Sequence, residues 1–234
     1  SIGIDLSFAP CIDLDYGVSE VIGDRAYHRD PEVVSRLAVA CMQGMRTAGM
    51  AATAKHFPGH GAVVADSHKA LPIDRRPLTE LIDELLPYRR MIANGLTSVM
   101  VAHVLFPEVD EAPAGFSARW IQQELRWGLG FTGAVFSDDL SMGGAAFAGT
   151  VPERARRAIE AGCDLLPICN DRPAVLATLT ELEGAADPLS QVRLVRLHGR
   201  PMPAREQLRR TAQWAECQRA IDHCRDAPSL QLNA

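Results

Sequence analysis

The sequence has few cysteines and no pair of them in a CxxC spacing. Its six cysteines are scattered through 234 residues, and a chain of this length can fold without disulfide staples. The pattern predicts reduced thiols and a cytoplasmic setting. No uninterrupted apolar run reaches the roughly 18 residues that a membrane helix needs, so we expect no membrane partner.

An excess of positive charge is also absent. The chain has 24 Lys and Arg against 29 Asp and Glu, a formal net charge of −5, and offers no basic field to a phosphate backbone. We therefore expect no nucleic-acid partner. Repeats, low-complexity tracts and linkers are missing too. We expect one domain over residues 1–234, with residues 185–234 as its polar helical C-terminal tail.

Apolar runs that suit buried strands alternate with amphipathic segments, which predicts parallel βα units. The expected strands are residues 2–14 (broken at Pro10), 50–57, 98–105, 133–138 and 163–169. The expected helices are residues 30–49, 78–94, 118–127, 152–161, a short one after Pro173, and 204–226. Asp30 should cap the first helix, and Pro87 should kink or divide the second.

Each expected strand ends in side chains able to do chemistry. In chain order these are Asp13 and Asp15, Lys55 and His56, His103, Ser137 with Asp138 and Asp139, and Asn170. Parallel α/β folds place active sites at this edge of the sheet. A dinucleotide site is disfavoured, because the sequence GHG at residues 59–61 has no third glycine and leads into a long loop. We predict an α/β fold of the TIM-type (β/α)8 barrel class, with five of its strands in this chain.

The stretch AKHFPGHGAVVADSHKALP (residues 54–72) concentrates polar chemistry. Asp66 and His68 are two residues apart, so in an extended loop their side chains can touch, and a carboxylate can hold the imidazole as a proton shuttle. The alternative is turn chemistry beside a surface histidine. Lys55 and His56 could hold sugar hydroxyls, or be a lysine reaching out from the strand end and a hydrogen-bonded core histidine.

A zinc site must also be considered, because His56, His60, Asp66 and His68 are ligand types close in sequence. However, the loop does not present a helical face as HExxH does, and no glutamate base lies between the histidines. We predict no metal, and a metallohydrolase on the three histidines remains as an alternative.

Two consecutive aspartates end the buried run GAVFSDD. In a strand they point in opposite directions, so one enters the mouth of the sheet, where an ionised carboxylate marks a functional candidate. Asp138 is that candidate, while Asp139 could instead cap the next helix. Arg25, in a loop after the first strand, could clamp a substrate oxygen or pair with Asp24 or Asp30.

Together these segments resemble the bacterial β-N-acetylglucosaminidases of glycoside hydrolase family 3, single-domain enzymes of peptidoglycan recycling. The resemblance lies in DLSFAPCIDL, IGDRAYHRDP, KHFPGHG with DSH, VAHVLFPEVD, SDDLSM and AGCDLLPICN, which follow the family's order over residues 3–170. It favours the functional interpretation of Asp66 and His68. Because the family's barrel begins with strands and a DQEGG-like loop that precede the first strand here, we expect only the C-terminal five βα units.

The resemblance implies a retaining hydrolysis without metal or organic cofactor. Asp138 would attack the anomeric carbon, His68 assisted by Asp66 would be the acid/base, and their loop would close over the sugar. Asp139 would support or cap.

By the same resemblance, Arg25, Lys55 and His56 would bind the ring of N-acetylglucosamine (GlcNAc). The expected substrates are GlcNAc-anhydroMurNAc peptides in the cytoplasm. A β-GlcNAc phosphorylase, and a non-catalytic muropeptide-binding protein, are the alternatives.

Overall fold

The computed structural model describes residues 3–184 and 187–226. The chain divides into two compact units, one of residues 5–199 and one of residues 1–4 with 200–234. In the second unit, the predicted helix 204–226 is two helices, α6 (Arg205–Arg209) and α7 (Ala212–Asp226). They are separated at Thr211, whose hydroxyl accepts the Trp214 N–H at the start of α7. The single domain with a tail from residue 185 stays a prediction.

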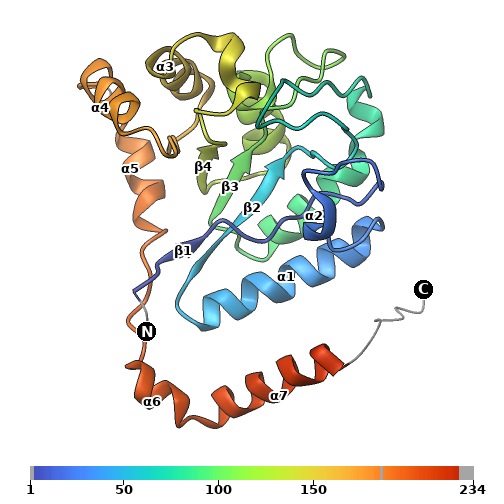
Figure 1. The fold of residues 1–234 in the computed structure, drawn as a ribbon, viewed down its shortest axis with the longest axis vertical. Coiled ribbons are helices and arrows are strands. Elements are labelled where there is room, and N and C mark those ends of the chain that lie inside the picture. Colours follow the sequence, from blue (N-terminus) through green and yellow to red (C-terminus); the bar gives the residue numbers. More distant parts are fainter. Residues whose placement is uncertain (1–2, 185–186, 227–234) are drawn as a thin grey trace. The chain divides into compact units, whose positions relative to one another are not determined.

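The larger unit is built on a parallel sheet whose strands follow one another in chain order (Figure 1). The strands are β1 (Leu6–Ser7), β2 (Ala51–Phe57), β3 (Ser98–Val101) and β4 (Ala134–Ser137). All three pairings are parallel, and helical segments connect consecutive strands. This is the arrangement of a (β/α)8 barrel wall, as predicted.

Both edges of the sheet are shorter than predicted. The first segment pairs only at Leu6–Ser7 and again at Cys11, opposite Lys55, with Pro10 between them. The fifth is a single bridge of Leu165 to Phe136, followed by Pro167. Proline has no N–H to donate to a ladder, so each edge is interrupted where one occurs.

The helices largely follow the prediction. Asp30 caps α1 (Pro31–Thr47) by accepting the N–H groups of Glu32 and Val33. A 3₁₀ turn precedes α2 (Ile82–Ala93), which runs through Pro87 undivided, so the prediction of a division there is wrong. The remaining helices of this unit are a π-helix (Arg119–Gly128), α3 (Val151–Ala161), α4 (Arg172–Glu181) and α5 (Pro188–Val195). Among the described helices, none combines the length and apolarity needed to cross a membrane.

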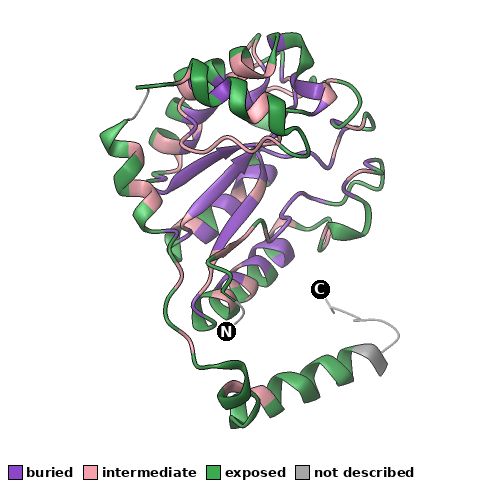
Figure 2. Cartoon of the chain, turned by 60° about the vertical axis from the view of Figure 1, so that its left-hand side comes forward, coloured by how far each residue is buried: buried purple, intermediate pink, exposed green. Residues whose placement is uncertain are grey.

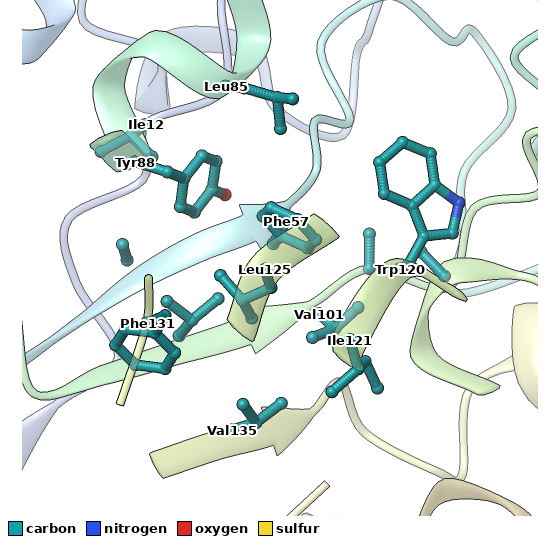
Figure 3. Close-up of a cluster of buried hydrophobic side chains, with 14 of the residues drawn as sticks. Ile12, Phe57, Leu85, Tyr88, Val101, Trp120, Ile121, Leu125, Phe131 and Val135 are labelled. Atoms are coloured by element: carbon teal, nitrogen blue, oxygen red, sulfur yellow. The ribbon is translucent and has the colours of Figure 1, made fainter. Parts of the chain in front are cut away.

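The main core lies between the sheet and the helices, and the strands themselves are its most buried part (Figure 2). Phe57 at the end of β2 makes edge contacts with Tyr88 at 5.1 Å and Trp120 at 5.9 Å between ring centroids (Figure 3). Strand residues alternate between faces. Val99 and Val101 therefore enter this core.

Their neighbours on the strands form a second, smaller cluster on the other face. Met100 and Phe136 pack there with Leu197, and Leu194 of α5 joins them. Side chains on both faces of β3 and β4 are thus buried, which holds the two strands in place. The loops that carry chemistry follow these ends.

Candidate active site

A cavity of about 110 Å³ lies beyond the ends of β2 and β4. It is smaller than the roughly 300–1,000 Å³ of pockets for drug-sized ligands, and its size suits one small polar ligand. Five of the six predicted site residues line it, and the sixth, Asp66, is bonded to one of them. The full lining is Val21, Ile22, Arg25, Lys55, His56, His60, Ser67, His68 and Asp138.

The two aspartates after β4 separate as predicted. Asp138 enters the cavity, while Asp139 Oδ1 accepts the N–H groups of Ser141 at 2.9 Å and Cys169 at 3.0 Å. Burial acts to raise the pKa of Asp139, but the hydrogen bonds from Ser141 and Cys169 outweigh it and hold the pKa below its ordinary value. Asp139 therefore stabilises the turn after the strand by accepting these hydrogen bonds, and it does not cap a helix. Asp138 is the carboxylate in the cavity.

Asp66 and His68 form the predicted pair. Asp66 Oδ1 accepts the backbone N–H of His68 at 2.9 Å and lies 2.8 Å from its Nδ1. The backbone hydrogen bond and then the side-chain one lower the pKa of Asp66. The ionised carboxylate accepts a hydrogen bond from Nδ1–H, so Nε2 is the nitrogen left for proton transfer. The His68 side chain is 60% exposed, open to a large leaving group.

The loop that carries this pair is docked on the segment that follows Asp138. Gly143 and Gly144, which open a 3₁₀ helix (Gly143–Ala148, η5), donate N–H groups to the carbonyls of His68 at 2.9 Å and Ser67 at 2.8 Å. The segments bearing Asp138 and His68 are thus joined by two backbone hydrogen bonds. The expected closure of the loop over a sugar stays a prediction.

Lys55 and His56 lie in β2 just before its last residue, Phe57, with a cis peptide bond between them, and both line the cavity. Arg25 ends a 3₁₀ turn (Gly23–Arg25) and donates to the carbonyl of Val21. Within the described part of the chain, no ion pair joins Arg25 to Asp24 or Asp30. Its side chain lines the cavity.

Sequence reasoning named Asp13 and His103 among the strand-end groups but assigned them no function. His103 does not line the cavity; it is buried, stacks on Phe116 at 5.2 Å and lies with Nε2 3.2 Å from the Asp139 carbonyl. Asp13 lies beneath the cavity, with Oδ2 2.7 Å from His56 Nδ1. The sequence indicates Asp13 through its place inside the apolar run IDL, because a carboxylate is costly to bury without partners.

The metal-ligand atoms that lie close together are not those of the predicted alternative, His56, His60 and His68. Within the described residues, Cys11, Asp13 and His56 bring metal-ligand atoms within 4.8 Å of one another, and His60 and His68 lie outside that group. The 2.7 Å between His56 Nδ1 and Asp13 Oδ2 is a hydrogen-bond distance.

Comparison with known proteins decides the family. The model described as the glycosyl hydrolase family 3 N terminal domain matches residues 1–195. The chain belongs to glycosyl hydrolase family 3. Its family 3 relatives include a curated beta-hexosaminidase of Thioalkalivibrio sulfidiphilus, 48% identical over 233 residues, which cover 100% of this chain and 67% of the relative. Another, from Thiobacillus denitrificans, is 50% identical over 99% of this chain and 66% of its own length.

A solved family 3 structure agrees with this assignment. The crystal structure of NagZ from Neisseria gonorrhoeae in complex with N-trifluoroacetyl-D-glucosamine matches with a TM-score of 0.85 and 43% identity, over 96% of this chain and 66% of that one. These matches confirm the predicted TIM-type barrel fold. The chain spans about two thirds of the length of these family 3 relatives.

Proposed function

We propose that this chain carries the catalytic centre of a retaining β-N-acetylglucosaminidase. The observation that carries the proposal is a single cavity lined by a carboxylate, Asp138, and by an imidazole, His68, that a second carboxylate holds. These are the two groups that a retaining glycosidase needs, a nucleophile and a positioned acid/base. Curated relatives of this chain are beta-hexosaminidases, and the similar NagZ structure holds an N-acylated glucosamine.

The reaction has two steps. In the first, an Asp138 oxygen forms a bond to the anomeric carbon while the glycosidic bond breaks, and the leaving oxygen takes the proton from Nε2 of protonated His68. In the second, neutral His68 takes a proton from water as the water oxygen attacks the anomeric carbon, which releases the sugar and Asp138. Asp66 stabilises the imidazolium that is present before the first step and forms again in the second. A positioned acid/base of this kind contributes about 10²–10⁴-fold.

The other polar residues of the cavity suit recognition of one sugar. Lys55 and Arg25 bring charged donors, and His56 brings a ring held by Asp13. We propose terminal β-linked GlcNAc on anhydro-muropeptides, met in the cytoplasm, as the substrate. Mass spectrometry of GlcNAc-anhydroMurNAc peptides incubated with the protein tests this. The expected result is loss of one GlcNAc per molecule, and cleavage of only simple aryl glycosides would contradict it.

The activity itself is tested with a chromogenic aryl β-GlcNAc. We expect turnover by the chain, its loss in Asp138→Ala, and no change in Asp83→Asn, a matched control on the exposed side of α2. His68→Ala should lose about 10²–10⁴-fold on substrates with poor leaving groups, the contribution of a general acid. Undiminished turnover in Asp138→Ala would refute the proposal.

A phosphorylase is the second candidate, and the charge of the cavity favours it. The lining holds Arg25, Lys55 and three imidazoles against one carboxylate, Asp138, so a phosphate ion would meet little repulsion. Adding inorganic phosphate distinguishes the two reactions, because a phosphorylase would release GlcNAc-1-phosphate in place of GlcNAc. Calorimetric binding of GlcNAc without any turnover would instead indicate a non-catalytic binding protein.

A further inference from the structure

Asp13 receives hydrogen bonds from two separate parts of the site. Its side chain has no exposed surface. Oδ2 lies 2.7 Å from His56 Nδ1 and 3.1 Å from the Cys11 thiol that donates to it, and Oδ1 accepts the His60 backbone N–H at 2.7 Å. The His56 backbone N–H also points at the carboxylate, 3.2 Å from Oδ2. A buried carboxylate is costly without such donors.

These donors keep Asp13 ionised. Burial acts to raise the pKa of Asp13, but the interactions with His56 and the hydrogen bond from Cys11 lower it to about 2. An ionised carboxylate only accepts hydrogen bonds, so the proton between the two side chains belongs to His56 Nδ1. In the neutral imidazole the other nitrogen, Nε2, is then an acceptor. Since His56 lines the cavity, Nε2 is the atom that a ligand can meet.

The second set of contacts runs toward the acid/base pair. His60, anchored to Asp13 through its backbone, lies with Nε2 2.9 Å from the hydroxyl of Ser67. Ser67 stands between Asp66 and His68 in the chain. Burial lowers the pKa of His60 and so favours its neutral ring. We call the contact of this ring with the Ser67 hydroxyl the His60–Ser67 brace. Two hydrogen bonds thus connect Asp13 to the loop that carries the acid/base.

We propose that Asp13 is a positioning residue: it fixes His56 in the Nδ1–H form, so that Nε2 accepts a hydrogen bond from a sugar hydroxyl, and it anchors the His60–Ser67 brace beneath the acid/base loop. Asp13 does not line the cavity and acts through His56 and His60. Its importance for turnover rests on the proposed glycosidase function, whereas its effect on the His56 ring does not.

The ring itself is tested by NMR at a pH where His56 is neutral. Long-range ¹H–¹⁵N spectra distinguish the two neutral forms of each of the seven histidines, and His56→Asn assigns the signal. We expect Nδ1–H in the wild type, its loss in Asp13→Asn, and no change in Asp15→Asn, an exposed carboxylate two residues away. An Nε2–H form of His56 in the wild type would overturn the proposal, even if Asp13→Asn fails to fold.

Kinetics then separate positioning from mere structural support. A hydrogen bond to a charged group is worth about 1.5–3 kcal/mol, so Asp13→Asn should lower kcat/KM for an aryl β-GlcNAc about 10–100-fold. His56→Asn retains a donor toward Asp13 and lacks Nε2, so in that background Asp13→Asn should cost markedly less. Equal factors in both backgrounds would contradict action through His56. Absence of wild-type turnover would count against the proposed function and leave the NMR result to decide this inference.

Discussion

The substitution Gly144→Ala tests the connection between the nucleophile and the acid/base. A Cβ at Gly144 would lie 2.9 Å from the Ser67 carbonyl oxygen and 3.3 Å from His103 Cβ, both too close to be accommodated without a shift. The Gly144 bond to Ser67 and the adjacent Gly143 bond to His68 would be lost together. At about 1 kcal/mol each, they hold the loop in place by roughly 2 kcal/mol, or about 30-fold in docked population.

The loss should fall on general acid catalysis and not on sugar binding. We expect kcat/KM of Gly144→Ala to drop roughly 10–100-fold for an alkyl or phenyl β-GlcNAc, which needs protonation of its leaving group, and only a few-fold for a nitrophenyl β-GlcNAc. Gly44→Ala is the matched control, because Gly44 lies within α1 and a Cβ there would meet nothing within 4 Å. If Gly144→Ala behaves like Gly44→Ala, or if both substrates lose the same factor, the two backbone hydrogen bonds do not position the acid/base.

Further predictions concern stability and follow from burial. Burial raises the pKa of Glu84 to about 7 against the opposing hydrogen bond of Arg76. A carboxyl whose pKa is higher in the folded protein contributes stability at low pH, and this contribution is lost as pH rises. Between about pH 4.5 and 7, the free energy of unfolding of the wild type should therefore fall by on the order of 3 kcal/mol relative to that of Glu84→Gln. If urea unfolding gives the same difference in free energy of unfolding between the two proteins at both pH values, this prediction is wrong. Phe57→Ala, at a site with no exposed surface, should cost about 3–5 kcal/mol in the same assay, and a cost below about 1 kcal/mol would contradict the core described above. Asp30→Ala removes the cap of α1 and should cost about 1 kcal/mol, whereas Asp83→Asn should be neutral.

The sequence predicted the interior of the fold better than its edges. β2 and β4 lie within the predicted ranges because each is a short apolar run bounded by turn residues. The lengths of the two edge strands were overestimated. Apolar residues alone do not show which backbone N–H groups can pair, and the pairing is interrupted at Pro10 and Pro167. Pro87 was expected to kink or divide its helix, and α2 runs through it undivided.

The site was predictable where motifs carry it and not where contacts do. Asp138 was a candidate from its pattern, His68 became one through the family resemblance, and the cavity brings them together. The partnership of Asp13 with His56 joins residues 43 positions apart, and neither spacing nor composition indicates it. The docking of His68 on Gly143 depends likewise on a backbone contact between two distant loops, which no residue type specifies.

The central claim, that Asp138 is the nucleophile of a retaining glycosidase, is tested most directly by trapping the covalent intermediate. The protein is incubated with a fluorinated GlcNAc that carries an activated leaving group, digested, and analysed by mass spectrometry. We expect one glycosyl adduct, on the peptide containing Asp138, and none in Asp138→Asn. An adduct on another carboxylate, such as Asp66 or Asp139, would contradict it.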